Sequence, residues 1–422
     1  MDVILSFLPF FWYTPSPRFL EDVMHDLIAK GQACISDGEH DPMSKEAALA
    51  LDWKKTFKWN KHLVFNPRAL SLKYFKDLSP YIDIILGHKV VSCSKTSTKV
   101  LSVTLDNGIV INAKQFIDCS ASQAILSVAD NELIYGGDSS TRYQADYGFT
   151  EPHGYTENYE FCNCTTLMYR IAKGTEDLSG VDAHYYNGAA FYYYEQNPSK
   201  VYFNTVQYIA PDSGMDVINN GPDSVYASIA PETIRHWKKI KNDFMIDKLP
   251  DPITDYKFDS NAPMLGIRES YRALCERMLH EEQMYDRLYL ETIDRITEGQ
   301  NLDKTIAIGS YICDLFNDPH ISSDELTIMN RQIQNYRVPY GTIIPKQYKN
   351  LLVASRGAGL THIAASSFRL TKNMMQLGWA AGWAAILLNE NELDDFRDVD
   401  VETLQTDEYA GIRTMTYDLL NQ

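Results

Sequence analysis

The sequence predicts an α/β protein that contains an inserted, mainly antiparallel α+β domain. Two short apolar strands, in "QFIDCSAS" and "LLVASRGAGL", run into small residues, which is typical of strand ends that meet a ligand in an α/β sheet. Between residues 132 and 338, Tyr-rich alternating runs such as "HYYNGAAFYYYEQ" and "KVYFNTVQYIA" predict antiparallel strands with helices between them. After residue 338 the sequence again has the pattern of strands and helices in an α/β domain.

The remaining elements follow from local signals. A helix is expected from Pro67, with Asn66 as its N-cap, in "FNPRALSLKYFKDL". In "KVLSVTLDNGIVINA", alternating apolar residues meet at Asp106-Asn107-Gly108, which predicts a hairpin. "PETIRHWKKIKNDFM" has the pattern of an amphipathic helix. Asn350 to Ala354 form a strand that precedes a glycine loop and a long helix.

The composition is that of a globular protein, and it excludes some classes of binding partner. The 422 residues suffice for two domains, and the formal net charge of −17 argues against nucleic-acid binding, which needs clustered Lys and Arg. The seven cysteines are scattered and odd in number, which favours a reducing compartment, and no ligand-spaced pair predicts a metal site.

Neither apolar stretch of the sequence predicts a membrane segment. The start, "MDVILSFLPFFWYTP", lacks a basic region and is broken by Pro9, unlike a secretory signal. The run from Met374 to Leu388 is shorter than the roughly 20 residues of a spanning helix. We therefore expect a cytoplasmic protein without membrane association.

The segment from Gly359 to Ala385 carries the strongest functional pattern. Gly357-x-Gly359-x-x-His362 is close to a dinucleotide-binding fingerprint, but the third glycine is missing, so a phosphate-binding loop is the weaker interpretation. In the helix that follows, Gly378 and Gly382 lie on one face, which permits close approach by another helix, a sheet or a flat ligand. Its first turn offers free N–H groups to an electron-rich atom.

The stretch "VPYGTIIPKQYKNLLVASRGAGLTHIAASSFRLTKNMMQLGWAAGWAA" resembles the C-terminal signature of the FAD-dependent oxidoreductase family of glutathione-reductase-type flavoproteins. "QFIDCSAS", "TTLMYRI", "GIRESYR" and "IAIGSYICDL" resemble further family blocks in the same order, so that the resemblance covers about Phe65 to Gln405. It implies an FAD-binding, Rossmann-like domain made of residues 1–131 and 339–422. Residues 132–338 would form an inserted substrate domain.

The resemblance also implies which residues contact FAD. Val90 matches the strand position that meets the adenine, and Cys119, Ser120 and Ala121 match small residues beside the dinucleotide. Ser355 and Arg356 match the end of the last strand. The start of the long helix, which would face the flavin, is matched by Ser367, Arg369, Leu370 and Thr371.

The chain departs from the family pattern at the phosphate-binding end. The family begins with a βαβ unit that carries the glycine fingerprint, and none of the 22 glycines forms one. Met1 would fall after that unit, and the FAD-binding domain would be incomplete. Whether the chain alone retains FAD is therefore left open.

His362 and Arg268 are the candidate catalytic residues. His362 could transfer a proton near the flavin, or be a histidine simply bonded to a backbone carbonyl. Arg268 could bind an anionic substrate, or form a structural ion pair with Glu269. We expect either an oxidoreductase that passes a hydride from a small-molecule substrate to flavin, or a family remnant that acts as a binding module. The remnant could need a partner chain or a second copy. A carbohydrate-binding β module is a third hypothesis, based on the Tyr-rich middle alone.

Overall fold

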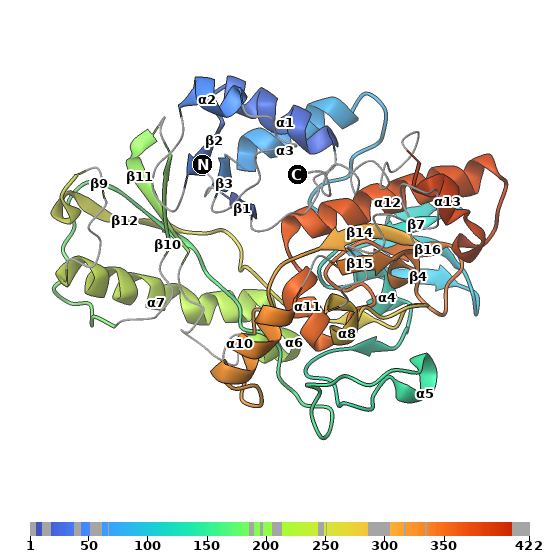
Figure 1. Cartoon of the computed structure of the whole chain (residues 1–422). Coiled ribbons are helices and arrows are strands. Elements are labelled where there is room, and N and C mark those ends of the chain that lie inside the picture. The colour runs from blue at the N-terminus through green and yellow to red at the C-terminus, as the bar shows by residue number, and fades with distance from the viewer. Residues whose placement is uncertain are drawn as a thin grey trace. The chain divides into compact units, whose positions relative to one another are not determined.

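The computed structural model describes residues 6–10, 18–37, 44–50, 61–65, 67–184, 190–194, 197–204, 213–243, 249, 251–285, 304–315, 318–333 and 336–406. They form a mixed α/β structure, as the sequence predicts (Figure 1). The chain divides into two compact units, each made of segments far apart in the sequence. The first contains Met1–Phe11, Arg18–Ile84 and Asn163–Arg268, and the second contains Trp12–Pro17, Ile85–Cys162 and Glu269–Gln422.

The N-terminal part of the first unit is a small antiparallel sheet with three helices. The strands β1 (Ser6–Phe10), β3 (Lys61–Phe65) and β2 (Ala33–Asp37) lie in this order, with β3 antiparallel to both neighbours. The helices are α1 (Arg18–Ala29), α2 (Lys45–Leu49) and α3 (Pro67–Leu78). The predicted helix start at Pro67 is confirmed, whereas its predicted cap, Asn66, lies outside the described residues.

The rest of the first unit is an antiparallel sheet with a long helix, which confirms the strands predicted from the Tyr-rich runs. The strand order is β10 (Ala190–Tyr194), β11 (Asn197–Asn204), β9 (Tyr169–Lys173) and β12 (Tyr256–Asn261). The helical segments are α6 (Ser213–Asn220), α7 (Pro222–Asn242) and the 3₁₀ turn η1 (Ile253–Asp255). The helix α7 begins well before Pro231, because Pro222 occupies its first turn after Gly221.

The second unit is organised around a parallel strand pair. β16 (Leu351–Val353) runs parallel to β7 (Phe116–Asp118), and both predicted strands are thereby confirmed. The predicted hairpin is also present: β5 (Val100–Leu105) pairs with β6 (Val110–Asn112) and with β4 (Val90–Lys95). Gly108 has a φ of 82° at its turn, a conformation that glycine adopts without strain.

The second unit contains further strands and helices. The strands are β8 (Leu133–Ile134), β13 (Arg272–Ala273), β14 (Thr305–Gly309) and β15 (Tyr336–Pro339). The helices are α4 (Ala124–Val128), α5 (Gln144–Tyr147), α8 (Glu281–Met284), α10 (Ser323–Gln332), η2 (Tyr340–Ile343), α11 (His362–Phe368), α12 (Thr371–Glu390), η3 (Phe396–Asp398) and α13 (Val401–Leu404).

Apolar packing in the second unit fixes the segment that carries the strongest sequence pattern. The long helix α12 packs its Leu377, Ala381 and Leu388 side into a cluster that also contains Ile306 of β14 and Leu352 of β16. This buried face holds α12 against the strands, as Figure 1 shows for α12 and β14. The predicted domain boundaries at 131 and 338 stay a prediction. Among the helices in the described ranges, none combines the length and apolar character needed to cross a lipid bilayer.

Candidate active site

His362 is the first residue of α11, and its side chain is buried. The Thr361 hydroxyl caps the helix by accepting a hydrogen bond from the Ala364 N–H at 3.2 Å. The backbone N–H of His362 donates to Asp138 Oδ2 at 2.7 Å. A carboxylate at this end of the helix is favourable because the N-terminal N–H groups carry partial positive charge. The imidazole ring is therefore attached to a well-anchored backbone.

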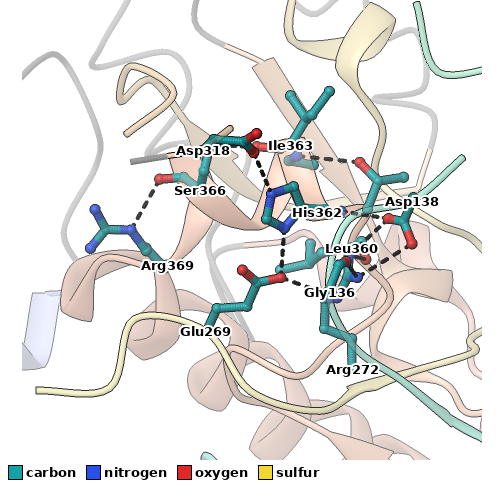
Figure 2. Close-up of polar contacts among 12 residues, drawn as sticks. Gly136, Asp138, Glu269, Arg272, Asp318, Leu360, His362, Ile363, Ser366 and Arg369 are labelled. Atoms are coloured by element: carbon teal, nitrogen blue, oxygen red, sulfur yellow. Dashed lines mark hydrogen bonds and ion pairs between the residues drawn. The ribbon is translucent and has the colours of Figure 1, made fainter. Parts of the chain in front are cut away.

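The imidazole lies between two buried carboxylates (Figure 2). His362 Nδ1 is 2.8 Å from Glu269 Oε1, and Nε2 is 3.3 Å from Asp318 Oδ2. Burial alone lowers the pKa of His362, but the charge of Glu269 and the hydrogen bonds to both carboxylates outweigh it and raise the pKa to about 10. The ring is thus an imidazolium at neutral pH, with both N–H groups donating.

A fully buried arginine completes this cluster. Arg272 Nη1 donates to Asp138 Oδ2 at 3.0 Å and to the Leu360 carbonyl at 3.2 Å, and Nη2 donates to the Gly136 carbonyl at 2.5 Å. Its Nε is 3.8 Å from Glu269 Oε1. Burial lowers the pKa of Arg272, but the Asp138 carboxylate raises it more, so the guanidinium stays charged. Arg272 therefore joins the 136–138 segment to the start of α11.

The charges in the cluster balance only when His362 is protonated. Asp138 also accepts from Arg142 Nη1 at 3.2 Å. The carboxylates of Asp138, Glu269 and Asp318 thus meet the cations of Arg142, Arg272 and His362. Removing the His362 proton would leave a net buried negative charge, which is unfavourable. In this arrangement His362 can stabilise a nearby anion by its positive charge, but it is a poor base. Its catalytic role stays a prediction.

Tyr155 extends the cluster, and the sequence interpretation did not include it. Its hydroxyl donates to Asp318 Oδ2, and its ring centroid lies 4.8 Å from that of His320. Burial and the nearby Asp318 carboxylate raise the pKa of Tyr155, so it stays a neutral donor. Tyr155, Asp318 and Glu269 come from three distant segments. No short motif joins them, so the sequence offers no signal for this chain of hydrogen bonds.

Arg268, the second catalytic candidate, belongs to the first unit, whereas His362 belongs to the second. The side chain of Arg268 is buried, and Nη1 donates to the Cys164 carbonyl at 3.0 Å. Its neighbour Glu269 contacts His362 and Arg272. The catalytic role of Arg268 stays a prediction.

The small residues after β7 form a turn that is closed by Asp118. Its Oδ1 accepts from the Ser120 N–H at 2.9 Å, and its Oδ2 accepts from the Ile125 N–H at 2.8 Å. The Ser120 hydroxyl in turn accepts from the Ala124 N–H at 2.8 Å. The first N–H groups of α4 are therefore bonded to side chains of the chain itself, where a bound phosphate would otherwise find its donors.

Four other predicted cofactor residues lie near this turn or in the neighbouring sheet. The Ser355 hydroxyl, just after β16, accepts from Gln123 Nε2 at 2.9 Å, so the segments that follow the two parallel strands lie in contact. The Ala121 carbonyl accepts from the Ser270 hydroxyl, and the side chain of Cys119 is exposed. Val90 begins β4, half-buried, opposite Leu105.

The glycine loop after β16 packs against protein rather than leaving room for a phosphate. A Cβ at Gly357 would lie 1.6 Å from Gln123 Nε2 and 2.6 Å from the Tyr271 carbonyl oxygen. A Cβ at Gly359 would lie 2.4 Å from the Arg277 carbonyl oxygen. These glycines are needed for backbone packing, which argues against the phosphate-binding interpretation of the loop.

Arg356 and Arg369 bring two guanidinium groups into the same region. Burial first, and then the charge of Arg369, lower the pKa of Arg356 to about 10. Arg369 Nε donates to the Ser366 carbonyl at 3.1 Å (Figure 2), and Nη2 donates to Asp314. The Ser367 hydroxyl lies 2.6 Å from the Tyr336 hydroxyl. The side chains of Ser367 and Arg369 thus hold the short connection between α11 and α12 in place.

The start of α12 carries an unsatisfied polar group that the sequence interpretation missed. Leu370 is the N-cap and provides no side-chain hydrogen bond, and the helix begins at Thr371. Asn373, in the first turn, is completely buried, yet neither Oδ1 nor Nδ2 has a hydrogen-bond partner among the described residues. A buried amide without partners is unfavourable by about 1–3 kcal/mol, so Asn373 is a candidate contact for a polar group.

The small-residue face of α12 is open in the structure. Within the described ranges, a Cβ at Gly378 or at Gly382 would meet no heavy atom closer than 4 Å. Trp379 and Trp383 lie beside them, with ring centroids 5.9 Å apart in an edge-to-face arrangement. In the part of the chain that the structure describes, no group of three or more His, Cys, Asp or Glu side chains could hold a metal ion.

Comparison with known proteins identifies the family. Residues 19–407 match the profile of the family described as FAD dependent oxidoreductase. The chain belongs to this family. Membership of this family identifies FAD as the cofactor of the chain. No curated protein matches the chain significantly.

Solved structures show only remote likeness to this FAD dependent oxidoreductase. The structure of pqsL, a probable FAD-dependent monooxygenase from Pseudomonas aeruginosa, is 8% identical, with 98% of this chain and 84% of that chain covered and a TM-score of 0.36. The peptidyl tryptophan dihydroxylase QhpG is 10% identical, with 78% and 62% covered and a TM-score of 0.28. The Diels-Alderase PyrE3 is 12% identical, with 46% and 37% covered and a TM-score of 0.24. TM-scores of this size do not establish a shared fold.

The residues of this chain fit one part of FAD and not another. The uncapped start of α12 and the unsatisfied Asn373 amide suit the polar edge of a flavin, which has both donors and acceptors. The glycine loop at 357–359 and the start of α4 do not suit its diphosphate, because protein atoms already occupy these positions.

Proposed function

We propose that the chain is a flavoenzyme that removes a hydride from a small organic substrate. The observation that carries the proposal is the buried, unsatisfied Asn373 at the uncapped start of α12, in a chain of the FAD dependent oxidoreductase family. FAD, when bound, accepts the hydride and passes the electrons to a second acceptor. The partial positive charge at the start of α12 would stabilise the negative charge that this transfer creates.

Asn373 would hold the polar edge of the flavin through its side-chain amide, and Leu370 and Thr371 would hold it through their backbone N–H groups. Arg356 adds positive charge to the same region, and Arg369 is paired with Asp314. The His362 imidazolium, held by Glu269 and Asp318, would keep the start of α11 in place and supply a fixed positive charge. His362 is then a positioning residue, unless substrate reaches one of its N–H groups.

An FAD titration of the whole chain tests the cofactor site. We expect the purified protein to bind FAD, with a visible flavin band that stays with the protein during gel filtration. Asn373→Leu, which keeps the volume and loses the amide, should weaken FAD binding about tenfold, because a lost hydrogen bond to a buried group is worth about 1–1.5 kcal/mol. Asn391→Leu, at the other end of α12, is the matched control.

The hydride transfer is tested separately by anaerobic bleaching of the flavin band. Small alcohols, amines and 2-hydroxy acids would be added to the FAD-loaded protein, with dithionite as the positive control. Bleaching by a member of the set supports the proposal. A band that responds to dithionite alone would exclude hydride abstraction from these substrate classes.

The alternative function is that of a binding module that has lost FAD. The absence of a glycine fingerprint among the 22 glycines supports it, as do the filled positions at Gly357 and Gly359. The protein would then stay colourless after added FAD, and Asn373→Leu would not change any flavin signal.

In this alternative the chain could also need to bind a partner chain or a second copy of itself. Apolar side chains on α3 and just after it are exposed, among them Leu72, Phe75 and Tyr81, the last at 85%. Exposed apolar patches are typical of interaction surfaces. Light scattering would give the oligomeric state of the purified chain.

A further inference from the structure

A cavity of about 380 Å³ in the second unit shares no lining residue with the sites described above. This volume is in the range of small-molecule pockets, about 300–1,000 Å³. Its wall combines the charged residues Glu276, Arg277, Lys304 and Arg397 with polar and apolar residues from η2 and α13. The cavity thus has three cations and one carboxylate, in a chain whose formal net charge is −17.

Two of these cations form no ion pair with a carboxylate in the described part of the chain. Arg397 is neutralised, because its Nε donates to Glu276 at 2.7 Å and its Nη1 donates to Asp395 at 3.0 Å. The side chains of Arg277 and Lys304 are exposed, and neither contacts a carboxylate in the part of the chain that the structure describes. After the Glu276–Arg397 pair is set aside, the wall carries two positive charges.

The backbone fixes both cations to the same short segment. The Arg277 N–H donates to the Gly341 carbonyl at 3.1 Å, and the Lys304 carbonyl accepts from the Tyr340 N–H at 2.7 Å. Gly341 makes room for the arginine, because a Cβ there would lie 2.8 Å from Arg277 Cγ. Lys304 has a φ of 57°, which is uncommon for a residue other than glycine and marks functional sites more often than other places.

We propose that this cavity binds the phosphate or carboxylate group of a small organic anion. Arg277 and Lys304 would contact the charged group, since guanidinium and ammonium groups form strong charge-assisted hydrogen bonds with such oxyanions. The Gln283 amide, also in the wall, adds a neutral donor, and Ile344 and Val401 offer apolar surface to the carbon part of the ligand. The proposal does not depend on FAD binding.

Isothermal titration calorimetry of the whole chain with phenyl phosphate, benzoate and inorganic phosphate tests this site. We expect saturable binding of at least one probe, and weaker binding at higher ionic strength. Arg277→Gln and Lys304→Gln should each weaken it about tenfold, or about 1.4 kcal/mol, because each removes a charge-assisted hydrogen bond. Tighter binding of phenyl phosphate than of benzoate assigns the site to phosphate groups, and the reverse assigns it to carboxylates.

Two further variants serve as controls. Lys89→Gln removes an exposed cation that does not line the cavity, and it should leave binding unchanged. Arg277→Lys keeps the charge and should retain most of the affinity. The proposal is overturned if no probe binds saturably, or if the two glutamine variants bind as the wild type does. Unchanged unfolding midpoints and FAD titrations of the variants separate this result from any failure of the flavin proposal.

Discussion

Asn373 shows how a single buried side chain can reveal a ligand site. A leucine at this position would fill a similar volume without leaving two polar atoms unpaired. We predict that Asn373→Leu stabilises the FAD-free chain by about 1–3 kcal/mol while it weakens FAD binding. Urea unfolding without added FAD, combined with the FAD titration, checks both effects. A variant that is less stable than the wild type would mean that the amide has a structural partner.

The buried His362 makes stability depend on pH. Its pKa is 6.5 in an unfolded chain and about 10 in the folded protein. Between these values the folded protein holds a proton that the unfolded chain releases, so stability falls as pH rises. The contribution is complete below pH 6.5 and is lost as pH rises through the folded pKa. We expect the unfolding equilibrium constant to increase about tenfold per pH unit between about 6.5 and 8.5, below the range in which unfolded thiols ionise.

Urea unfolding at a series of pH values measures this effect. His362→Gln should remove the pH dependence in this window and destabilise the chain by about 3–5 kcal/mol, because Glu269 and Asp318 lose their buried counter-charge. His88→Gln is the control, since His88 is partly exposed and pairs with Asp106 at 2.8 Å. If this variant does not fold, the wild-type pH series still decides. A flat wild-type profile would show that His362 is neutral in the folded protein.

Individual residues also show what sequence patterns can and cannot reveal. The short spacing in "GLTH" and "SSFRL" pointed to His362 and to the start of α12. The partners of His362 could not be predicted, because Glu269 and Asp318 are 93 and 44 residues away from it in the chain. Asn373 looked like an ordinary helix residue, and only its lack of partners in the folded protein distinguishes it.

At the scale of elements, glycines of the same segment have opposite roles. Gly359, in the loop after β16, packs against the backbone at 275–277, whereas Gly378 lies on the open face of α12. We predict that Gly359→Ala destabilises the chain by several kcal/mol, because its Cβ would lie 2.4 Å from the Arg277 carbonyl oxygen and 2.7 Å from Cys275 Cβ. Gly378→Ala should instead stabilise α12 by about 0.5–1 kcal/mol, because alanine is the better helix former.

Thermal unfolding of both variants measures these two changes in stability. Both substitutions add one methyl group, so a difference in sign reports only the local environment. A stabilised Gly359→Ala variant would mean that the loop after β16 is free to move away from residues 275–277. A destabilised Gly378→Ala variant would instead mean that another group approaches the open face of α12.

For the whole molecule, local patterns predicted elements better than their assembly. The hairpin at 106–108 and the strands β7 and β16 follow from turn chemistry and apolar runs, which are local properties. The division into two units joins 18–84 to 163–268 and 85–162 to 269–422. Such contacts between distant segments have no signature in a single sequence, since they depend on packing.

Each unit has its own apolar core, and this determines how the chain should unfold. Trp237 is completely buried in a cluster of the first unit, and Leu352 is completely buried in a cluster of the second. Units with separate cores can unfold in separate steps. Trp237→Ala and Leu352→Ala each remove a large buried side chain, which destabilises a core by about 2–5 kcal/mol. We therefore predict two calorimetric transitions, each shifted by only one of these variants.

Added FAD should shift the same transition as Leu352→Ala, in the opposite direction, because Asn373 and α12 belong to the second unit. The shift should grow with FAD concentration and decrease in Asn373→Leu. A single transition that both core variants and FAD move equally would show that the two units unfold together. In that case the discontinuous segments of the chain form one cooperative structure.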